Sequence, residues 1–82
     1  MYFVYLLQSR RDNGFYIGMT SNIQSRFEEH ENGLVESTKN RRPWKLIYFE
    51  AYLSKESAEE RERKLKNFGS SYVGLLKRLG LK

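Results

Sequence analysis

Five polar side chains stand where a small core would hold apolar residues, and their types match the needs of phosphodiester hydrolysis. They are Tyr5, Tyr16, Arg26, His30 and Glu62. Such hydrolysis requires a deprotonated nucleophile, neutralisation of charge on phosphorus and a stabilised leaving oxygen, all held in line. Phenols, an imidazole, a guanidinium and a carboxylate together contain a base, a proton acceptor, a phosphate clamp and a metal ligand. These residues therefore form the candidate catalytic set.

Taken singly, each of these residues has a structural alternative that the sequence leaves open. A helix arginine is most often a surface residue, a lone histidine at a helix end is most often structural, and tyrosines are usually core residues. Glu62 has the alternative of a partly buried ion pair with Arg26 or Arg61. Most of the set nevertheless lies in three consecutive elements between positions 5 and 30, and this joint arrangement favours a site.

Three strands can be read from the sequence. Residues 2–8 are aromatic or aliphatic and apolar on both faces, which is typical of a central strand covered on two sides. Asp12-Asn13-Gly14 is a turn signal, and residues 15–19 form a second short strand. Residues 45–53 form the third strand.

The register of the hairpin decides whether the two phenols meet. A strict two-residue turn at Asn13-Gly14 would place Tyr16 roughly 20 Å from Tyr5, at ~3.3 Å per residue. A looser connection over residues 9–14 places Tyr16 near Leu7, diagonal to Tyr5. We expect the looser hairpin, because only this register lets both phenols point into one site.

A first helix is expected over residues 22–32. Thr20, Ser21 and Asn22 are N-cap candidates before it. Ser21 and Gln24 have the spacing of a capping box, and Gly33 is a C-terminal stop. Its buried stripe contains Ile23 and Phe27 at helical spacing.

Arg26 and His30 fall on the edge of that stripe, so both are expected to face partly inward. The planar guanidinium of Arg26 suits a phosphate. His30 is the one histidine of the chain; we expect it to titrate near neutrality and to accept a proton from a phenol or a water.

A second helix is expected to end near Asn67, and residues 70–79 favour a third, shorter helix that closes the core. Ser54 or Ser57 caps the second helix, and Ser57 with Glu60 again has capping-box spacing.

The inward line of the second helix contains a carboxylate. Ala58 and Leu65 are seven residues apart, and Glu62 lies between them on the same line. Glu62 is the only acid that we place on an inward surface, so it is the expected metal ligand. Mg²⁺ suits one carboxylate, because this ion prefers oxygen donors and keeps most of its waters.

The bulk properties limit the protein to one domain over residues 1–82, with one modest core. The chain has no cysteine, which excludes disulfides and a thiolate metal site. No apolar run approaches the roughly 20 residues that span a bilayer, and the first residues do not have the pattern of a signal peptide. We therefore expect a cytoplasmic protein with no membrane partner.

Positive charge predicts a polyanionic partner, although a solvated basic surface is an equal alternative. The net charge is +5, and the segment 39–45 holds four basic residues and no acid within an expected exposed loop at 34–44. The candidate phosphate-binding residues are Arg10, Arg11, Thr38, Lys39, Arg41, Arg42 and Lys45. Phosphate contacts give affinity without sequence reading, so we expect weak, structure-directed or non-specific binding, or targeting by another protein.

The order and spacing of several short motifs resemble the GIY-YIG endonuclease superfamily over nearly the whole chain. The motifs are Val4-Tyr5, Tyr16-Ile17-Gly18-Met19-Thr20, Arg26 with His30, Arg41 to Tyr48, and Ala58 with Glu62 and Leu65-Lys66. More narrowly, they are similar to its small stand-alone members, which resemble the N-terminal nuclease domain of the bacterial excision-repair subunit.

This resemblance implies an α/β (α+β) fold: a three-stranded antiparallel sheet flanked by helices, in the order strand, strand, helix, strand, helix, helix. It also implies hydrolysis of DNA to a 5′-phosphate and a 3′-hydroxyl with one divalent ion, Mg²⁺ or Mn²⁺.

The resemblance further implies a role for each candidate catalytic residue. Tyr5 acts as or orients the general base, and Tyr16 positions the attacking water. Arg26 clamps the scissile phosphate, His30 draws the proton from Tyr5, and Glu62 holds the metal.

Two positions depart from the family pattern. Phe3 stands at the glycine position of the first motif, which affects packing. Met19 follows Gly18 where some relatives carry a lysine, so proton abstraction falls on His30.

Two other functions remain open from the residues alone. One is a non-catalytic nucleic-acid-binding module that uses the same basic surface. The other is a protein-interaction domain whose tyrosines all belong to the core. The oligomeric state is not indicated by the sequence.

Overall fold

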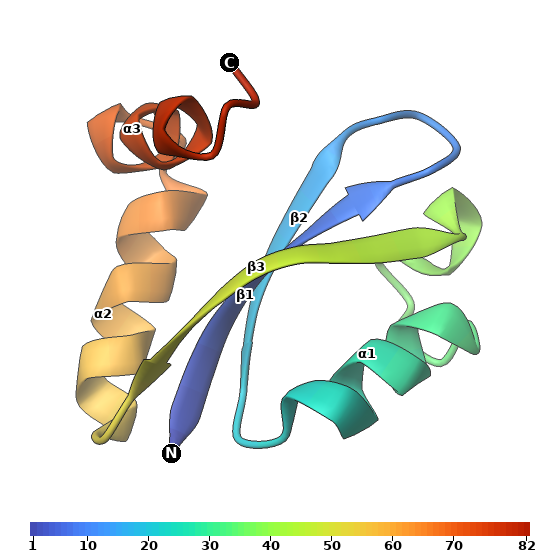
Figure 1. Cartoon of the computed structure of the whole chain (residues 1–82). Helices are drawn as coiled ribbons and strands as arrows, with labels where there is room; N and C mark the ends of the chain where they lie inside the picture. The colour runs from blue at the N-terminus through green and yellow to red at the C-terminus, as the bar shows by residue number, and fades with distance from the viewer.

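The computed structural model describes residues 1–82 and has an α+β architecture of three antiparallel strands and three α-helices (Figure 1). The predicted element order is confirmed, with one addition: a short 3₁₀ helix lies in the loop that was expected to be irregular. The elements are β1 (Tyr2–Ser9), β2 (Phe15–Thr20), α1 (Ile23–Glu31), η1 (Lys39–Arg41), β3 (Trp44–Tyr52), α2 (Lys55–Lys66) and α3 (Ser70–Arg78).

Strand β1 is the centre of the sheet, whose strand order is β2-β1-β3. The looser hairpin is confirmed, because Leu7 pairs with Tyr16 and Tyr5 pairs with Gly18. The buried hydroxyl of Ser9 holds the connection: it accepts the backbone N–H groups of residues 11 and 12 and donates to the carbonyl of Arg41 at 2.7 Å. The turn is thereby fastened to the loop before β3.

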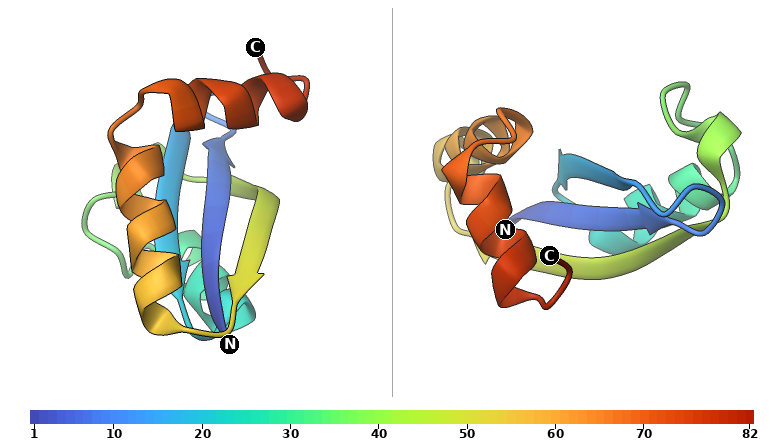
Figure 2. Two further views of the ribbon diagram at one scale, coloured as in Figure 1. Left: turned by 90° about the vertical axis from the view of Figure 1, so that its left-hand side faces the viewer. Right: turned by 90° about the horizontal axis from the view of Figure 1, so that it is seen from above.

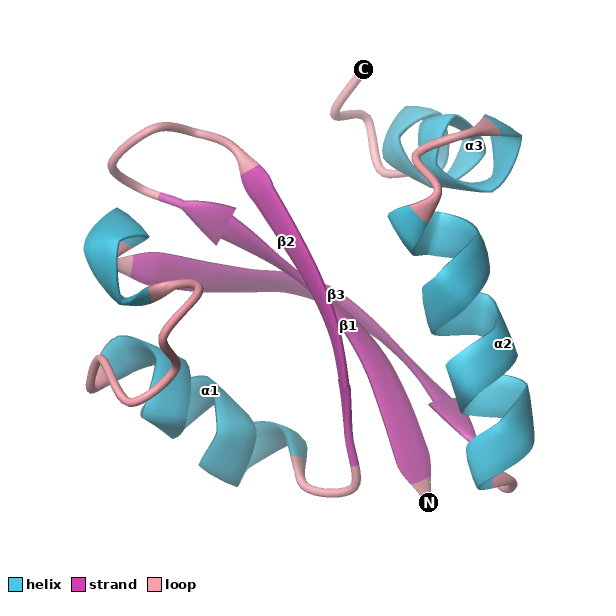
Figure 3. Ribbon diagram, turned by 180° about the vertical axis from the view of Figure 1, so that it is seen from behind, coloured by secondary structure: helices cyan, strands magenta, loops and turns pink.

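The two faces of β1 are covered by different helices, as its apolar residues on both sides predict. Val4 and Leu6 belong to a core formed with α2 and α3, whereas Tyr5 and Leu7 pack with Trp44 and the apolar residues of α1. Figures 2 and 3 show α1 on one side of the sheet and α2 with α3 on the other. The chemistry-bearing phenol therefore lies on the α1 side of the central strand.

One helix cap differs from the capping-box prediction, and the other is one of the two predicted candidates. Asn22, not Ser21, caps α1 by accepting the N–H of Ser25 at 3.0 Å, because the hydroxyl of Thr20 binds the N–H of Asn22 and moves the helix start by one residue. Ser54 caps α2 through the N–H of Ser57. No helix in the structure is long and apolar enough to cross a membrane.

Candidate active site

Tyr5 reaches the site because residue 18 of the neighbouring strand has no side chain. Gly18 lies opposite Tyr5 in the sheet, and a Cβ at this position would lie 2.3 Å from the Tyr5 hydroxyl oxygen and 2.4 Å from the attached ring carbon. The ring of Tyr5 therefore crosses directly over the backbone of β2. Any larger residue at position 18 would force this buried ring to move.

The hydroxyl of Tyr5 ends at the buried ring of His30, in the last turn of α1. The Tyr5 oxygen and Nε2 of His30 are 2.8 Å apart, and Nδ1 of His30 is 2.8 Å from Oγ1 of Thr38. His30 and Thr38 have no exposed surface, and Tyr5 is 3% exposed. The prediction that His30 faces only partly inward is therefore corrected to complete burial.

Burial changes the pKa of both members of this pair. It raises the pKa of Tyr5 to about 12, although the guanidinium of Arg26 acts in the opposite direction. Burial and the charge of Arg26 lower the pKa of His30 to about 4, while Glu29 opposes them. The expectation that His30 titrates near neutrality is wrong for this reason: an imidazolium without solvent loses its hydration. At neutral pH both groups are uncharged.

Arg26 lies beside the phenol and carries the positive charge of the site. Its Nη1 forms a 2.8 Å ion pair with Glu29 on the next turn of α1, and its side chain is 36% exposed. Glu29 and, more weakly, Tyr5 raise the pKa of Arg26 against the opposing effect of burial. A guanidinium that is partly open to solvent and fully charged is suited to a phosphate oxygen.

Tyr16 completes an aromatic cluster around His30. Its ring centroid lies 5.1 Å from that of His30, 6.5 Å from that of Tyr5 and 6.2 Å from that of Trp44. The contact with His30 is edge-on and the other two are tilted, all at ordinary distances for aromatic pairs. The hydroxyl of Tyr16 makes no hydrogen bond within the protein, whereas that of Tyr5 is engaged, so the two phenols are free to perform different tasks.

Glu62 is partly exposed and forms neither of the ion pairs considered from the sequence. It pairs with Lys66 at 3.0 Å, with 22% of its side chain exposed. Its negative charge contributes to the raised pKa of Tyr5, which places it within electrostatic reach of the phenol. Lys66 also lines a cavity of about 330 Å³ together with Tyr16 and Arg41. Through this cavity, α2 and β2 meet near the candidate site.

The residues present fit a single hydrated Mg²⁺ better than a fully protein-coordinated ion. The structure has no group of three or more histidine, cysteine or acidic side chains that could hold a metal. Glu62 offers one oxygen, Oε1, that makes no hydrogen bond or ion pair with the protein. Because Mg²⁺ keeps several waters and is often bound by one or two carboxylates with substrate phosphates, this donor is chemically suitable. The phosphates of bound DNA would neutralise the remaining positive charge of the ion.

A second inward acid was missed from the sequence. Glu50 on β3 has only 15% of its side chain exposed, compared with 22% for Glu62, so Glu62 is not the only acid on an inward surface. Glu50 accepts hydrogen bonds from Tyr48 and Tyr52 and forms a 2.8 Å ion pair with Arg61. This network holds the pKa of Glu50 below its ordinary value despite burial. Its oxygens are occupied, which indicates a structural role.

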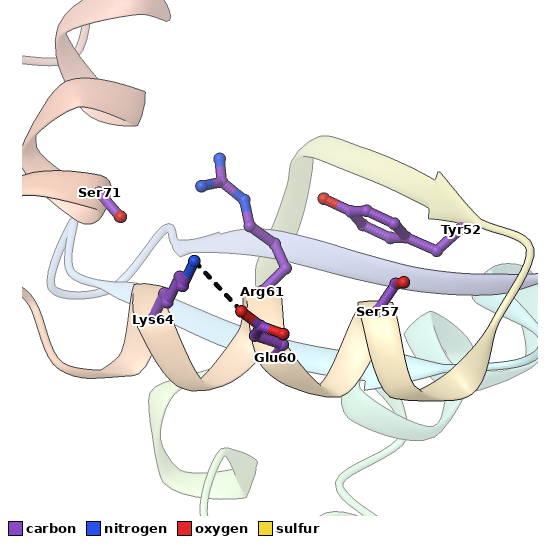
Figure 4. A pocket seen from close by; sticks show the side chains of 6 residues that line it. All are labelled: Tyr52, Ser57, Glu60, Arg61, Lys64 and Ser71. Carbon is purple, nitrogen blue, oxygen red and sulfur yellow. Dashed lines mark ion pairs between the residues drawn. The ribbon is translucent and has the colours of Figure 1, made fainter.

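A cavity of about 310 Å³ next to this network is not part of the candidate site. Figure 4 shows its lining, in which Lys64 and Glu60 on α2 form an ion pair with each other. Arg61, which also lines it, is already paired with Glu50. The cavity includes Tyr52 of β3, whereas the Tyr16 cavity lies at β2, the other edge of the sheet. Its cations are thus neutralised within the protein.

Most of the predicted phosphate-binding residues gather where the hairpin meets the segment before β3. Arg11 donates to the carbonyl of Asn40, and Arg41 forms a 2.8 Å ion pair with Asp12, so the two segments are joined. Arg10 and Lys45 line a shared cavity of about 210 Å³. We call these residues the basic cluster: Arg10, Arg11, Lys39, Arg41, Arg42 and Lys45.

The cations of this basic cluster differ in their exposure and in whether an acidic side chain pairs with them. Four of them are exposed and pair with no acid: Arg10, Arg11, Arg42 and Lys45. Lys39 pairs with Glu36 at 3.2 Å. The prediction that Thr38 offers its hydroxyl to a phosphate is wrong. Thr38 is fully buried, and its hydroxyl contacts Nδ1 of His30. It is therefore not accessible to a phosphate.

The sequence contained no local signal for this role of Thr38. The contact joins the last turn of α1 to a loop eight positions later, and the loop is fixed from β3, because the indole N–H of Trp44 donates to the carbonyl of Thr38 at 3.1 Å. A buried threonine in a polar, aperiodic segment cannot be distinguished from an exposed one by pattern. The tertiary fold alone identifies it.

Comparison with known proteins gives a consistent result. A model of the GIY-YIG catalytic domain matches residues 1–74. The UPF0213 protein of Clostridium perfringens (strain 13) is 39% identical over 67 residues, which cover 80% of this chain and 71% of the relative. The UPF0213 protein of Staphylococcus haemolyticus is 38% identical over 68 residues, which cover 82% of each chain.

A solved structure has the same fold. The solution NMR structure of the UPF0213 protein BH0048 from Bacillus halodurans superimposes with a TM-score of 0.59 at 30% identity, and the match covers 96% of this chain and 85% of that one. Together with the arrangement of Tyr5, Tyr16, Arg26 and His30 around one point of the sheet, these matches show that the chain belongs to the GIY-YIG family of nuclease-type domains, among its small UPF0213 members.

Proposed function

We propose that this protein is a divalent-metal-dependent endonuclease that hydrolyses DNA to a 5′-phosphate and a 3′-hydroxyl. The observation that carries the proposal is the buried 2.8 Å contact between the Tyr5 hydroxyl and Nε2 of His30, with the charged Arg26 beside it. A phenol that can pass its proton to a neutral imidazole while it accepts another is a general base at neutral pH.

The proton path follows from these contacts. Tyr16, whose hydroxyl has no partner in the protein, orients the attacking water. The oxygen of Tyr5 accepts a proton from this water, and the phenolic proton of Tyr5 passes to Nε2 of His30. The water oxygen forms the new bond to phosphorus. The bond from phosphorus to the 3′ oxygen breaks, its electron pair stays on that oxygen, and the leaving group is protonated by solvent.

Charge stabilisation is assigned to two further side chains. Arg26 binds a non-bridging oxygen of the scissile phosphate through its planar guanidinium. Glu62 would hold the ion, and Mg²⁺ or Mn²⁺, when bound, would supply Lewis-acid stabilisation of the developing negative charge. The substrate strand is assigned to the cavity lined by Tyr16 and by Lys66, the ion-pair partner of Glu62.

The basic cluster supplies affinity for the nucleic acid. Its exposed, unpaired cations are suited to the phosphate backbone, and such contacts do not distinguish base sequences. Binding is therefore structure-directed or non-specific, or is directed by a targeting protein.

A plasmid-nicking assay with Mg²⁺ or Mn²⁺ tests this function. Nicking should disappear in Tyr5→Phe and in Glu62→Ala, while circular dichroism shows that both variants remain folded. Tyr72→Phe and Glu60→Ala are matched controls: Tyr72 lies on α3 and packs against the core on that side of the sheet, and Glu60 forms an exposed pair with Lys64 away from the site. Nicking that survives Tyr5→Phe at the wild-type rate would contradict the assigned base.

A non-catalytic DNA-binding module is the second candidate, and the four exposed cations of the basic cluster that have no acidic partner favour it. This function predicts salt-sensitive retention of DNA, no cleavage at any metal concentration and no effect of Glu62→Ala on retention. The same preparation distinguishes the two functions, since only the nuclease converts supercoiled plasmid to the open form.

A further inference from the structure

The neutral imidazole of His30 can exist in two tautomers, and only one of them allows Nε2 to accept a proton from Tyr5. Both ring nitrogens are engaged at 2.8 Å, Nε2 by the Tyr5 hydroxyl and Nδ1 by the Thr38 hydroxyl. A neutral imidazole has one N–H donor and one acceptor nitrogen. A hydroxyl can donate or accept a hydrogen bond. The tautomer therefore depends on which other hydrogen-bond partners the hydroxyls of Tyr5 and Thr38 have.

At the Tyr5 end, the phenolic hydrogen has one destination. Nε2 of His30 is the only protein acceptor within hydrogen-bond distance of the Tyr5 hydroxyl. The neighbouring guanidinium of Arg26 can only donate. If Nε2 carried the hydrogen, the buried Tyr5 oxygen would face donors on two sides and its own hydrogen would have no protein partner, which is costly at a buried position.

At the Thr38 end, the hydroxyl hydrogen also has a destination other than the ring. Oγ1 of Thr38 lies 3.4 Å from the carbonyl oxygen of Val35, which is only an acceptor. A hydroxyl that donates to this carbonyl receives the hydrogen bond from Nδ1–H of His30. Both ends of the chain of contacts therefore favour the same tautomer, with the hydrogen on Nδ1.

We propose that Thr38 is a positioning residue that fixes His30 in the Nδ1–H tautomer and so presents an unprotonated Nε2 to the Tyr5 hydroxyl. The residue is itself held in place, because its carbonyl accepts the indole N–H of Trp44 and its N–H donates to the carbonyl of Val35. After proton transfer, the same oxygen accepts the Nδ1–H of the imidazolium. The significance of this contact for catalysis rests on the proposed nuclease function; the tautomer itself does not.

The presence of a single histidine makes the tautomer directly measurable. Long-range ¹H–¹⁵N correlation spectra of the protein at pH 7, without DNA or metal, give one set of ring-nitrogen signals. The wild type should show a protonated Nδ1 and an unprotonated Nε2. Thr38→Val has nearly the same shape but no acceptor for Nδ1–H, so its ring should shift to the Nε2–H tautomer. Thr38→Ser keeps the hydroxyl and should keep the wild-type signals.

Plasmid nicking provides the second measurement. Thr38→Val should lower nicking at saturating DNA at least about tenfold without weakening DNA retention; in a serine protease, loss of the correct histidine tautomer costs about 10⁴ in kcat. Thr38→Ser should restore most of this rate. A structural role alone would change the urea midpoint without this difference between the valine and serine variants.

Three results would overturn the proposal: an Nε2–H ring in the wild type, an unchanged tautomer in Thr38→Val, or a serine variant whose ring matches that of the valine variant. A wild type with the Nδ1–H tautomer but no nicking activity would refute the nuclease function while leaving the positioning role of Thr38 supported.

Discussion

Mild acid should destabilise this protein through one buried side chain, His30. The folded pKa of His30 is about 4, compared with an ordinary value of 6.5, so the unfolded chain binds a proton before the folded chain does. Stability is therefore complete above pH 6.5 and is lost as the pH falls towards 4. At 1.36 kcal/mol per pKa unit, the whole difference corresponds to about 3 kcal/mol, of which about 2 kcal/mol is lost between pH 7 and pH 5.

Other groups contribute little within this range. The carboxyls of Asp12 and Glu50 have lowered pKa values, and their stabilisation disappears mainly at lower pH. Arg26, which lowers the pKa of His30, stays charged throughout, and Glu29 on the same helix opposes it.

Urea denaturation followed by the fluorescence of Trp44 measures this effect, since this single tryptophan is 1% exposed in the folded state. For a domain of this size, a loss of 2 kcal/mol corresponds to a fall in Tm on the order of 10 °C. His30→Gln removes the titrating group and keeps a polar side chain, so its stability should be nearly constant between pH 7 and pH 5. An equal decrease in the variant, or an NMR titration of His30 centred near pH 6.5, would refute the reasoning.

Three substitutions test separate parts of the structure. Gly18→Ala places a methyl group against the ring of Tyr5; it should lower the free energy of unfolding by about 1 to 3 kcal/mol in urea denaturation and abolish nicking. Glu50→Gln removes the charge that Arg61 and two phenols share, so it should cost about 2 kcal/mol while nicking continues. Lys45→Ala removes an exposed cation and should reduce the slope of log K against log salt by about 0.9 on duplex DNA, measured by fluorescence anisotropy.

Each substitution has a matched control. Gly74→Ala, at a helix position with no atom within 4 Å of the added methyl, should stabilise by about 0.5 to 1 kcal/mol. Glu60→Gln removes one partner of an exposed pair and should change stability by less than about 1 kcal/mol. Lys55→Ala, at the start of α2, should leave the salt slope unchanged. A Gly18→Ala protein as stable and active as the wild type would contradict the close approach of Tyr5.

The fold could be predicted well because its signals are local or periodic. The apolar residues on both faces of residues 2–8 indicated a central strand, and the need to bring two phenols together selected the correct hairpin register. The helix caps were predicted less accurately, because more than one residue could cap each helix: Thr20, Ser21 or Asn22 before α1, and Ser54 or Ser57 at α2. The hydroxyl of Thr20 decides between Ser21 and Asn22, and a contact of this kind is not contained in a capping pattern.

The sequence predicted which residues form the site, but it predicted their burial and their contacts less well. Helical spacing placed His30 beside the buried stripe of α1, yet its complete burial depends on Tyr5, Tyr16 and Thr38, which approach from outside the helix. Burial is what moves its pKa away from neutrality. Glu50 was missed because its partner Arg61 lies on α2, and strand alternation alone does not reveal that a charged residue has such a partner.

The alternation of β1 also determines which changes this strand can tolerate. Adjacent positions face opposite sides, so Val4 and Tyr5 can be substituted independently, one altering packing under α2 and the other altering the proton path. A change in length has a different effect. Deletion of one residue between Val4 and Leu7 would turn each later side chain of this strand to the opposite face of the sheet. A functional variant should therefore tolerate conservative substitutions in this strand much better than insertions or deletions.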